Sequence, residues 1–209
     1  MKYRAVVFDL WNTLVVWPVE EGRNFYGRMA DAVGIERDLF SEAWTGHYDL
    51  RATGPLEPSV RAVCEQLGVQ EDRVQNLIGV RVDWTREALV PRPGAVEVLD
   101  ELRRRGFRLG LISVCSEEVP QLWDGTELAS RIDEPVFSCS VGVAKPDPRI
   151  YRIAADRLGV ETGDCLFVDD QPNFVDGALA AGMDAVLIGD EPWDGPRIER
   201  LEEVLQAVE

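Results

Sequence analysis

Apolar residues in this chain form short continuous runs that alternate with segments of helical spacing. The first run, residues 5–8, is apolar on both faces and rich in β-branched and aromatic residues, which is typical of a central strand in a parallel sheet. Further strands are predicted at residues 107–112, 135–138, 165–168 and 185–188. Helices are predicted at residues 94–105, 117–130, 148–158, 175–181 and 196–208. This alternation predicts the α/β class, with a doubly wound, Rossmann-like parallel sheet covered by helices on both faces.

Between residues 17 and 89 the pattern is helical throughout. Apolar residues recur three and four positions apart in four segments, which are separated by Gly34, a turn at residues 53–55 and Gly68. The stretch is far longer than the roughly dozen residues that a crossover between parallel strands needs. We therefore expect two domains, a Rossmann-like core of residues 1–16 and 90–209 and a small all-helical cap of residues 17–89 inserted after the first strand.

The composition of the chain argues against two classes of binding partner. The formal charge of −16 argues against nucleic acid and against an anionic membrane, because both are bound by an excess of lysine and arginine. No apolar run approaches the roughly 20 residues that span a bilayer, and the chain begins in a strand without a signal-peptide pattern. We expect a cytoplasmic protein that binds a small molecule, as a monomer or a homodimer. The four cysteines show no Cys-x-x-Cys spacing, which favours reduced thiols.

Polar residues lie where three of the predicted strands end. Asp9 ends the first strand, Ser113 the second, and Asp169 with Asp170 the fourth, while Lys145 lies in a loop just before a helix. The carboxyl ends of parallel strands open on one edge of the sheet, so these side chains can converge. Local sequence leaves open whether Asp9 caps the following turn or belongs to a site. Together, three carboxylates, a hydroxyl and an ammonium group are suited to holding a divalent cation such as Mg²⁺ and an anionic substrate.

Four segments in this order resemble the motifs of the haloacid dehalogenase-like superfamily of hydrolases. They are FDLWNTL, LISVCS, VAKPDPRIY and FVDDQPNFVDGALAAGM, and the resemblance covers essentially the whole chain. The helical insertion after the first motif is similar to the C1 cap of that family. The resemblance implies a Rossmann-like core, a hydrolase activity and Mg²⁺ as cofactor.

Carried over to this sequence, the resemblance implies that Asp9 is a nucleophile that forms a covalent aspartyl intermediate. Ser113 would then hydrogen-bond the transferring group, and Lys145 would neutralise the nucleophile and the substrate oxygens. Such roles are chemically sound, because a carboxylate nucleophile divides one difficult displacement into two easier ones.

The resemblance also implies substrate and metal contacts. Substrate binding is expected from Asn12, Thr13 and Val114. Metal binding is expected from the Asp9 and Asp170 carboxylates, the Trp11 backbone carbonyl and Asp169, which supports the metal or its waters.

Trp11 departs from the pattern of the phosphatases in this superfamily, which have a second aspartate two residues after the nucleophile. An indole ring cannot protonate a leaving alkoxide or activate water, and loss of an acid–base group costs about 10²- to 10⁴-fold in rate. The dehalogenases of the superfamily also lack this acid and commonly carry an aromatic residue there, because halide leaves without a proton. They are metal-free, however, and Val114 replaces the asparagine usual after the second-motif serine, so the intact pair Asp169–Asp170 favours phosphoryl chemistry.

Three functions are therefore open. The favoured one is a Mg²⁺-dependent phosphatase for a small metabolite, with weak or atypical activity. The alternatives are a 2-haloacid dehalogenase-type hydrolase and a catalytically impaired binding or regulatory protein. Candidates for the missing acid are His47, Glu117 and Glu118, each of which has a plainer explanation as a surface residue or helix-terminal acid.

Residues of the predicted cap are also candidates for substrate contact. Arg23 and Arg51 could bind a substrate anion. Four aromatic residues could line a cleft between cap and core, or simply form the cap interior: Trp17, Tyr26, Trp44 and Trp84.

Overall fold

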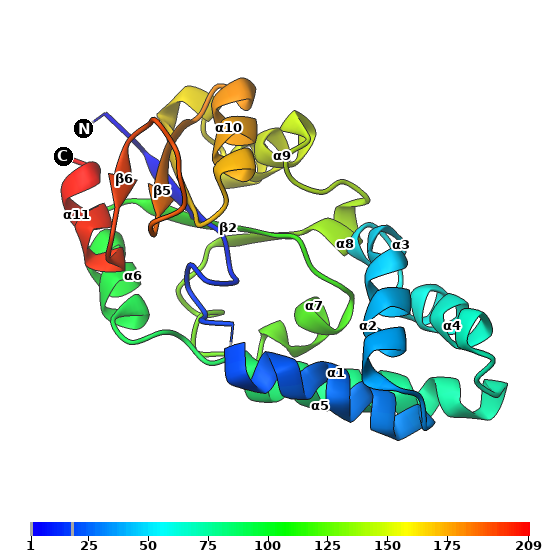
Figure 1. Ribbon diagram of the computed structural model, residues 1–209. Helices are drawn as coiled ribbons and strands as arrows, with labels where there is room; N and C mark the ends of the chain where they lie inside the picture. Colours follow the sequence, from blue (N-terminus) through cyan, green and yellow to red (C-terminus); the bar gives the residue numbers. More distant parts are fainter. Residues whose placement is uncertain (1, 18) are drawn as a thin grey trace.

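The chain folds around a six-stranded parallel sheet whose order is β3-β2-β1-β4-β5-β6 (Figure 1). The computed structural model describes residues 2–17 and 19–209, apart from the side chains of residues 19–24. The strands are β1 (Ala5–Phe8), β2 (Arg108–Ser113), β3 (Glu134–Phe137), β4 (Cys165–Asp169), β5 (Asp184–Ile188) and β6 (Arg197–Ile198). β1 is completely buried between β2 and β4, as its continuous apolar run predicts.

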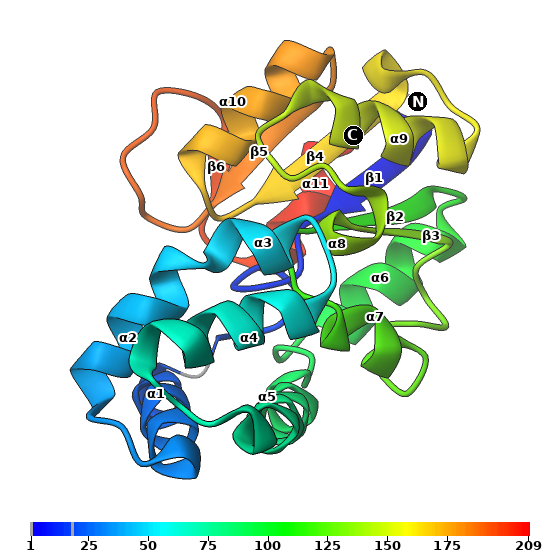
Figure 2. The same cartoon turned by 90° about the vertical axis from the view of Figure 1, so that its right-hand side faces the viewer.

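Helices cover both faces of the sheet (Figure 2). Val6 and Phe8 point to one face, where they join the core of α6 (Ala95–Arg104), α7 (Glu118–Trp123) and the C-terminal α11 (Val204–Ala207). Ala5 and Val7 point to the other face and pack with α9 (Pro148–Leu158) and α10 (Pro172–Ala181). The period of two along β1 therefore divides its side chains between two cores, and the doubly wound α/β fold is confirmed.

A helical insertion follows β1, as expected. Its helices are α1 (Val19–Val33), α2 (Arg37–Gly46), α3 (Tyr48–Ala52), α4 (Leu56–Leu67) and α5 (Val74–Ala88), with a 3₁₀ turn at Glu71–Arg73 before α5. They have a core of their own, built from residues such as Phe25, Phe40, Trp44 and Leu77. Gly34 and Gly68 end α1 and α4 with φ of 72° and 67°, a left-handed conformation that glycine adopts without strain. The domain boundaries at residues 16/17 and 89/90 stay a prediction.

The insertion contains one helix more than its apolar pattern predicts. The short α3 is too brief for a periodic signal, and it lies beside the one-turn α8 (Ser138–Val141) of the sheet domain in both views (Figure 1, Figure 2). Across the described residues, no helix is long and apolar enough to cross a membrane.

Two predicted helices are wrong in part. The amphipathic tail at residues 196–208 begins as strand β6, continues as a 3₁₀ turn at Leu201–Glu203 and only then becomes α11. Its apolar residues are buried as expected, but Ile198 pairs with Ile188 at the sheet edge, and this pairing supplies backbone hydrogen bonds that a helix would have made.

The helix expected at residues 117–130 ends at Trp123. A series of turns replaces its second half, and there the Thr126 hydroxyl donates to the Trp123 carbonyl at 2.8 Å. Side-chain bonding of this kind competes with helix continuation. The four cysteines are free thiols, as predicted.

Candidate active site

The register of the central strands places two carboxylates side by side. Phe8 pairs with Val168, and the Asp9 backbone N–H donates to the Val168 carbonyl at 2.9 Å. Asp9 and Asp169, the next residues of these two neighbouring strands, are therefore side by side. Both are buried, at 6% and 0% exposure. The first and fourth motifs meet at the carboxyl edge of the sheet, where ligands bind in open α/β folds.

Lys145 joins these carboxylates from a third segment. Its ammonium group donates to Asp9 Oδ1 at 2.6 Å and to Asp169 Oδ2 at 2.5 Å, and its side chain is completely buried. The two carboxylates raise the pKa of Lys145 despite the opposing effect of burial, so the group is a cation. Because Lys145 bonds only Oδ1 of Asp9, the second oxygen of that carboxylate stays available for chemistry.

The loop that carries Lys145 is held by direct contact with α10. A Cβ atom at Gly177 would lie 2.7 Å from the Pro146 carbonyl oxygen and 2.8 Å from the Tyr151 hydroxyl. Only glycine lets the helix approach this loop so closely. The position of Lys145 is therefore set by backbone packing in the sheet domain.

Asp170 completes a cluster of three carboxylates. Oxygen atoms of Asp9, Asp169 and Asp170 all lie within 4.8 Å of one another. Burial raises the pKa of Asp9, and burial together with the charge of Asp9 raises the pKa of Asp169 to about 8, although Lys145 acts in the opposite direction. One ammonium group is thus too little positive charge for three ionised carboxylates, and a hard cation with a preference for oxygen ligands would stabilise their ionised forms.

The turn after β1 is tied to the acidic cluster. Asn12 adopts a φ of 61°, a left-handed conformation that asparagine tolerates better than most residues. Its side-chain N–H donates to Asp170 Oδ2 at 3.2 Å, and its Oδ1 accepts from the Trp17 backbone N–H at 3.1 Å. Arg92 also donates to the Asn12 and Thr13 carbonyls. These contacts fix the path of the chain from Asp9 into the insertion.

Two buried hydroxyls near the cluster have no hydrogen-bond partner among the described residues. They are Thr13 Oγ1 and Ser113 Oγ, and both side chains have no exposed surface. A buried hydroxyl without a partner is unfavourable by about 1–3 kcal/mol. Such groups are suited to a ligand that supplies the missing hydrogen bond.

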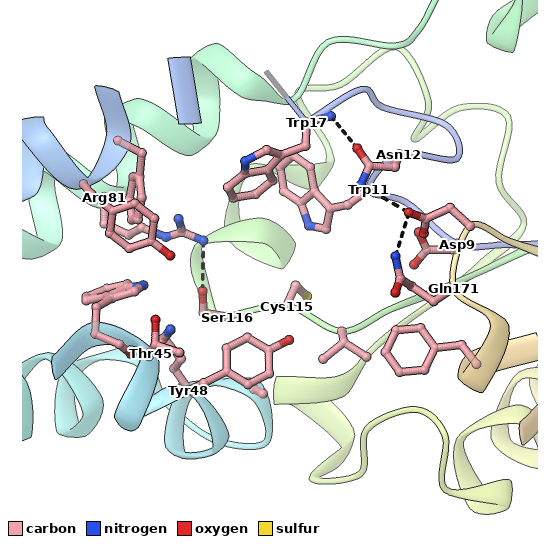
Figure 3. Close-up of a pocket in the computed structure, with 18 residues that line it drawn as sticks. Asp9, Trp11, Asn12, Trp17, Thr45, Tyr48, Arg81, Cys115, Ser116 and Gln171 are labelled. Carbon is pink, nitrogen blue, oxygen red and sulfur yellow. Dashed lines mark hydrogen bonds between the residues drawn. The ribbon is translucent and has the colours of Figure 1, made fainter. Parts of the chain in front are cut away.

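A cavity of ≈ 350 Å³ lies between the sheet edge and the insertion (Figure 3). Its core-side wall contains Asp9, Asn12, Val114 and Asp170. Aromatic residues form much of the remaining wall: Trp11, Trp17, Phe25, Tyr26, Trp44, Tyr48 and Phe174. Of the two alternatives for the aromatic candidates, Trp17, Tyr26 and Trp44 line the cavity. Trp84 packs inside the insertion, 4.6 Å from the Trp17 ring.

The three sequence candidates for a proton donor do not line the cavity. His47 Nε2 contacts Gln66 Oε1 at 2.9 Å on the surface, and Glu117 accepts the Leu56 backbone N–H at 3.1 Å. Glu118 is buried and pairs with Arg81 at 2.6 Å. These contacts give all three residues structural roles. Of the two arginine candidates, Arg51 lines the cavity, and the side chain of Arg23 lies outside the described residues.

Two further residues of the site were not predicted. Gln171 donates from its backbone to Asp169 Oδ1 at 2.8 Å and from its side chain to Asp170 Oδ2 at 3.0 Å. Its position directly after the acidic pair is a signal that could have identified it. Arg81 lines the cavity from the middle of α5, where an arginine has no local feature that distinguishes it from a surface residue.

Comparisons with known proteins identify the family of this chain. The family model described as haloacid dehalogenase-like hydrolase matches residues 3–182. A phosphatase of Mycobacterium tuberculosis is 33% identical over 205 residues, covering 90% of this chain and 88% of that protein. (S)-2-haloacid dehalogenase 4A of Burkholderia cepacia is 34% identical over 200 residues, covering 88% and 82%. Relatives of this chain thus include both phosphatases and haloacid dehalogenases.

The fold is shared with solved structures. The crystal structure of a phosphatase from Thermococcus onnurineus superposes with a TM-score of 0.73, and the match covers 98% of this chain and 97% of that one at 23% identity. This likeness concerns the arrangement of the sheet and the helical insertion.

Proposed function

Because this chain belongs to the haloacid dehalogenase-like hydrolase family, we propose that it is a Mg²⁺-dependent phosphatase that acts on a small organic phosphate through a covalent intermediate on Asp9. The cluster of Asp9, Asp169 and Asp170 with Lys145 carries the proposal. The relatives include phosphatases and haloacid dehalogenases, and three adjacent carboxylates beside a single ammonium group favour the metal-dependent reaction over the metal-free one.

Asp9 would be the nucleophile. The carboxylate oxygen that Lys145 does not bond attacks phosphorus, the bond from phosphorus to the leaving oxygen breaks, and an aspartyl phosphate forms. Water then attacks the same phosphorus, the bond between phosphorus and the Asp9 oxygen breaks, and inorganic phosphate, a proton and the free carboxylate are released. The two displacements replace one direct attack of water on the ester.

Lys145, Ser113 and Thr13 would stabilise charge on the transferring group. The Lys145 ammonium group is fixed by its contacts with Asp9 and Asp169, and its third N–H would donate to a phosphoryl oxygen. Ser113 Oγ and Thr13 Oγ1 are buried without a partner among the described residues, and a phosphoryl oxygen would accept their hydrogen bonds. Asn12 and Val114 line the adjacent wall of the cavity and would contact the substrate.

The acidic residues fit Mg²⁺ through their donor set. Asp9, Asp170 and the Trp11 carbonyl would hold the ion, and Asp169 would support it or its waters. When bound, Mg²⁺ neutralises charge on the phosphoryl oxygens and orients the phosphorus for attack.

Trp11 limits the range of leaving groups in this proposal. It lies in the cavity wall and stacks edge-on to Trp17 at 5.0 Å, and its indole N–H is not acidic enough to protonate a leaving alkoxide. Acyl and aryl phosphates have good leaving groups, which depart without that proton. We expect slow turnover of simple alkyl phosphates.

The same residue supports a second candidate function, halide release from a 2-haloacid. Halide leaves as an anion and needs no proton, so a tryptophan at position 11 does not hinder its departure. The acidic cluster argues against this function, because without a metal ion the single charge of Lys145 opposes the mutual repulsion of three carboxylates.

A turnover panel distinguishes these functions. Phosphate release from acetyl phosphate, 4-nitrophenyl phosphate and an alkyl phosphate is measured with Mg²⁺ and with EDTA, beside halide release from a 2-haloacid, with Asp9→Asn as the blank. The proposal expects phosphate release that requires both Mg²⁺ and Asp9. Halide release without Mg²⁺ would establish the second function, and silence in every assay would favour a binding protein.

A further inference from the structure

Arg51 is a buried cation that no described carboxylate neutralises. Its exposure is 5%, and none of the described acidic side chains lies within 4.0 Å of its guanidinium group. Two hydrogen bonds to neutral groups hold it, both from Nη1: one to the Trp44 carbonyl at 2.7 Å and one to Ser59 Oγ at 3.4 Å. An uncompensated buried charge is unfavourable and attracts an anion.

The guanidinium group is held in a fixed plane. It stacks on the Trp44 ring at 4.2 Å and faces the Tyr48 ring at 5.2 Å. Because Arg51 lines the cavity and its two hydrogen bonds use Nη1 alone, the described contacts leave Nε and Nη2 for a ligand. A stacked, preorganised guanidinium edge is suited to an oxyanion, which it binds through two parallel hydrogen bonds.

The neighbouring Arg81 does not remove this positive charge, since Glu118 already pairs with it at 2.6 Å. Arg51, Arg81 and Glu118 together carry one net positive charge. Burial, followed by the charge of Arg81, lowers the pKa of Arg51 to about 10, which leaves it protonated at neutral pH. The chain as a whole has a formal charge of −16, so this local positive charge would draw an anionic ligand to the cavity.

The cavity therefore has two polar ends separated by aromatic surface. Arg51 and Arg81 come from α3 and α5 of the insertion. Asp9 lies at the end of the cavity opposite Arg81 (Figure 3). The aromatic residues between them provide apolar surface for the body of a ligand.

We propose that the substrate carries a second oxyanion, such as a carboxylate, on an aromatic or aliphatic body, and that Arg51 binds this group while the first is held at Asp9. This inference rests on the proposed function for the reaction at Asp9 and adds the substrate class. Arg51 acts in recognition and takes no part in the displacement at phosphorus.

Binding of unreactive probes tests this inference without turnover. Dissociation constants are measured in the presence of Mg²⁺ by calorimetry for ω-carboxyalkylphosphonates of increasing chain length and for alkylphosphonates of matched length. A phosphonate cannot be hydrolysed, and the series covers a range of separations between its two anionic groups. At one length or more, we expect the carboxylated probe to bind about tenfold more tightly, as for a hydrogen bond to a charged group.

The variants Arg51→Gln and Arg51→Lys identify the residue responsible. Arg51→Gln should remove the preference for the carboxylated probes, and Arg51→Lys should keep part of it. The matched control is Arg61→Gln, which alters an exposed arginine of α4 that pairs with Glu57 at 2.6 Å, and it should keep the full preference.

Equal affinity for both probes at every length, or no measurable binding by any probe, would overturn the inference. Phosphate turnover without a carboxylate preference would leave the proposed function standing and remove Arg51 from recognition. An Arg51-dependent preference in a protein that hydrolyses no phosphate would leave Arg51 in recognition and remove the proposed phosphatase function. Retention of the preference by Arg51→Gln would also contradict the assignment.

Discussion

Arg81 of the helical insertion donates to Glu118 of the sheet domain at 2.6 Å, and both side chains are buried. The Glu118 carboxylate also accepts from Ser116 Oγ at 2.7 Å. The adjacent Glu117 accepts the Leu56 backbone N–H, so two consecutive acids of one strand-to-helix connection contact two different helices of the insertion. Two of the three residues considered as proton donors, Glu117 and Glu118, thus attach the insertion to the sheet domain.

Removal of the Glu118 charge should destabilise the fold. Glu118→Gln leaves Arg81 buried without a counter-charge, and breaking a buried ion pair costs about 3–5 kcal/mol in the free energy of unfolding. Urea denaturation measures this change. Asp83→Asn is the control, because it breaks the exposed pair with Arg86 and should change stability by less than about 1 kcal/mol. Equal midpoints for Glu118→Gln and wild type would contradict a stabilising role for the pair.

Ser113→Ala should separate stability from activity. Ser113 Oγ is buried without a partner among the described residues, so its removal should raise the free energy of unfolding by about 1 kcal/mol. Loss of a hydrogen bond to the transferring group should lower kcat by about 10²- to 10³-fold. Ser138→Ala provides the contrast, because Ser138 Oγ accepts the Cys115 backbone N–H at 3.0 Å and its loss should destabilise the protein. Wild-type kcat in Ser113→Ala would remove this residue from catalysis.

Asp170→Asn should weaken Mg²⁺ binding by about 10- to 100-fold or more, because it removes one charged oxygen ligand of the proposed site. Calorimetric titration with Mg²⁺ measures the affinity. Asp176→Asn is the matched control, since Asp176 lies on the following helix and accepts from Trp193 Nε1 at 3.0 Å, away from the cluster. Unchanged affinity in Asp170→Asn would place the metal elsewhere.

The metal-free protein should lose stability as pH rises. Burial raises the pKa of Asp169 from 3.8 to about 8 in the folded chain, so protonation of this group favours folding. Its contribution is complete below the unfolded pKa and is lost as pH rises through about 8. We expect the Tm in EDTA to fall between about pH 5.5 and about pH 8.5, and Mg²⁺ to reduce the fall by compensating the carboxylate. An equal slope in Asp169→Asn would assign the effect to other groups.

Trp11→Asp should increase phosphatase activity by supplying the missing acid–base group. The gain should approach about 10²- to 10⁴-fold for an alkyl phosphate, whose leaving group needs a proton. Trp11→Asn is the control, because it removes the same indole packing against Trp17 and introduces no titratable group. Equal kcat/KM in the two variants would show that cavity shape limits the rate.

The sequence predicted the parts of this protein that depend on local pattern. The strand at residues 5–8 was predicted because a buried parallel strand needs a continuous apolar run. The sequence also predicted that Asp9, Lys145 and Asp169 converge, because parallel strands end at one edge of the sheet. In the structure Lys145 contacts both carboxylates.

Features created by tertiary packing were not predicted. The ion pair of Arg81 and Glu118 joins two helices far apart in sequence, and neither residue carries a local signal. The tail residue Ile198 has the spacing of an amphipathic helix, yet it pairs with Ile188, because an open sheet edge was available there. Arg51 was considered as an anion contact, but the fixed plane of its guanidinium group depends on the rings of Trp44 and Tyr48.

Gly177 contributes to positioning the catalytic residues and lies far in sequence from the helices that would recognise the substrate. It keeps α10 against the loop of Lys145, so this loop is positioned by contacts within the sheet domain. Arg51, proposed to bind the second oxyanion, and Tyr48, whose ring its guanidinium group faces, are both on the insertion. Substitutions in α3 would therefore alter the choice of substrate and leave in place the contacts that hold Asp9 and Lys145 together.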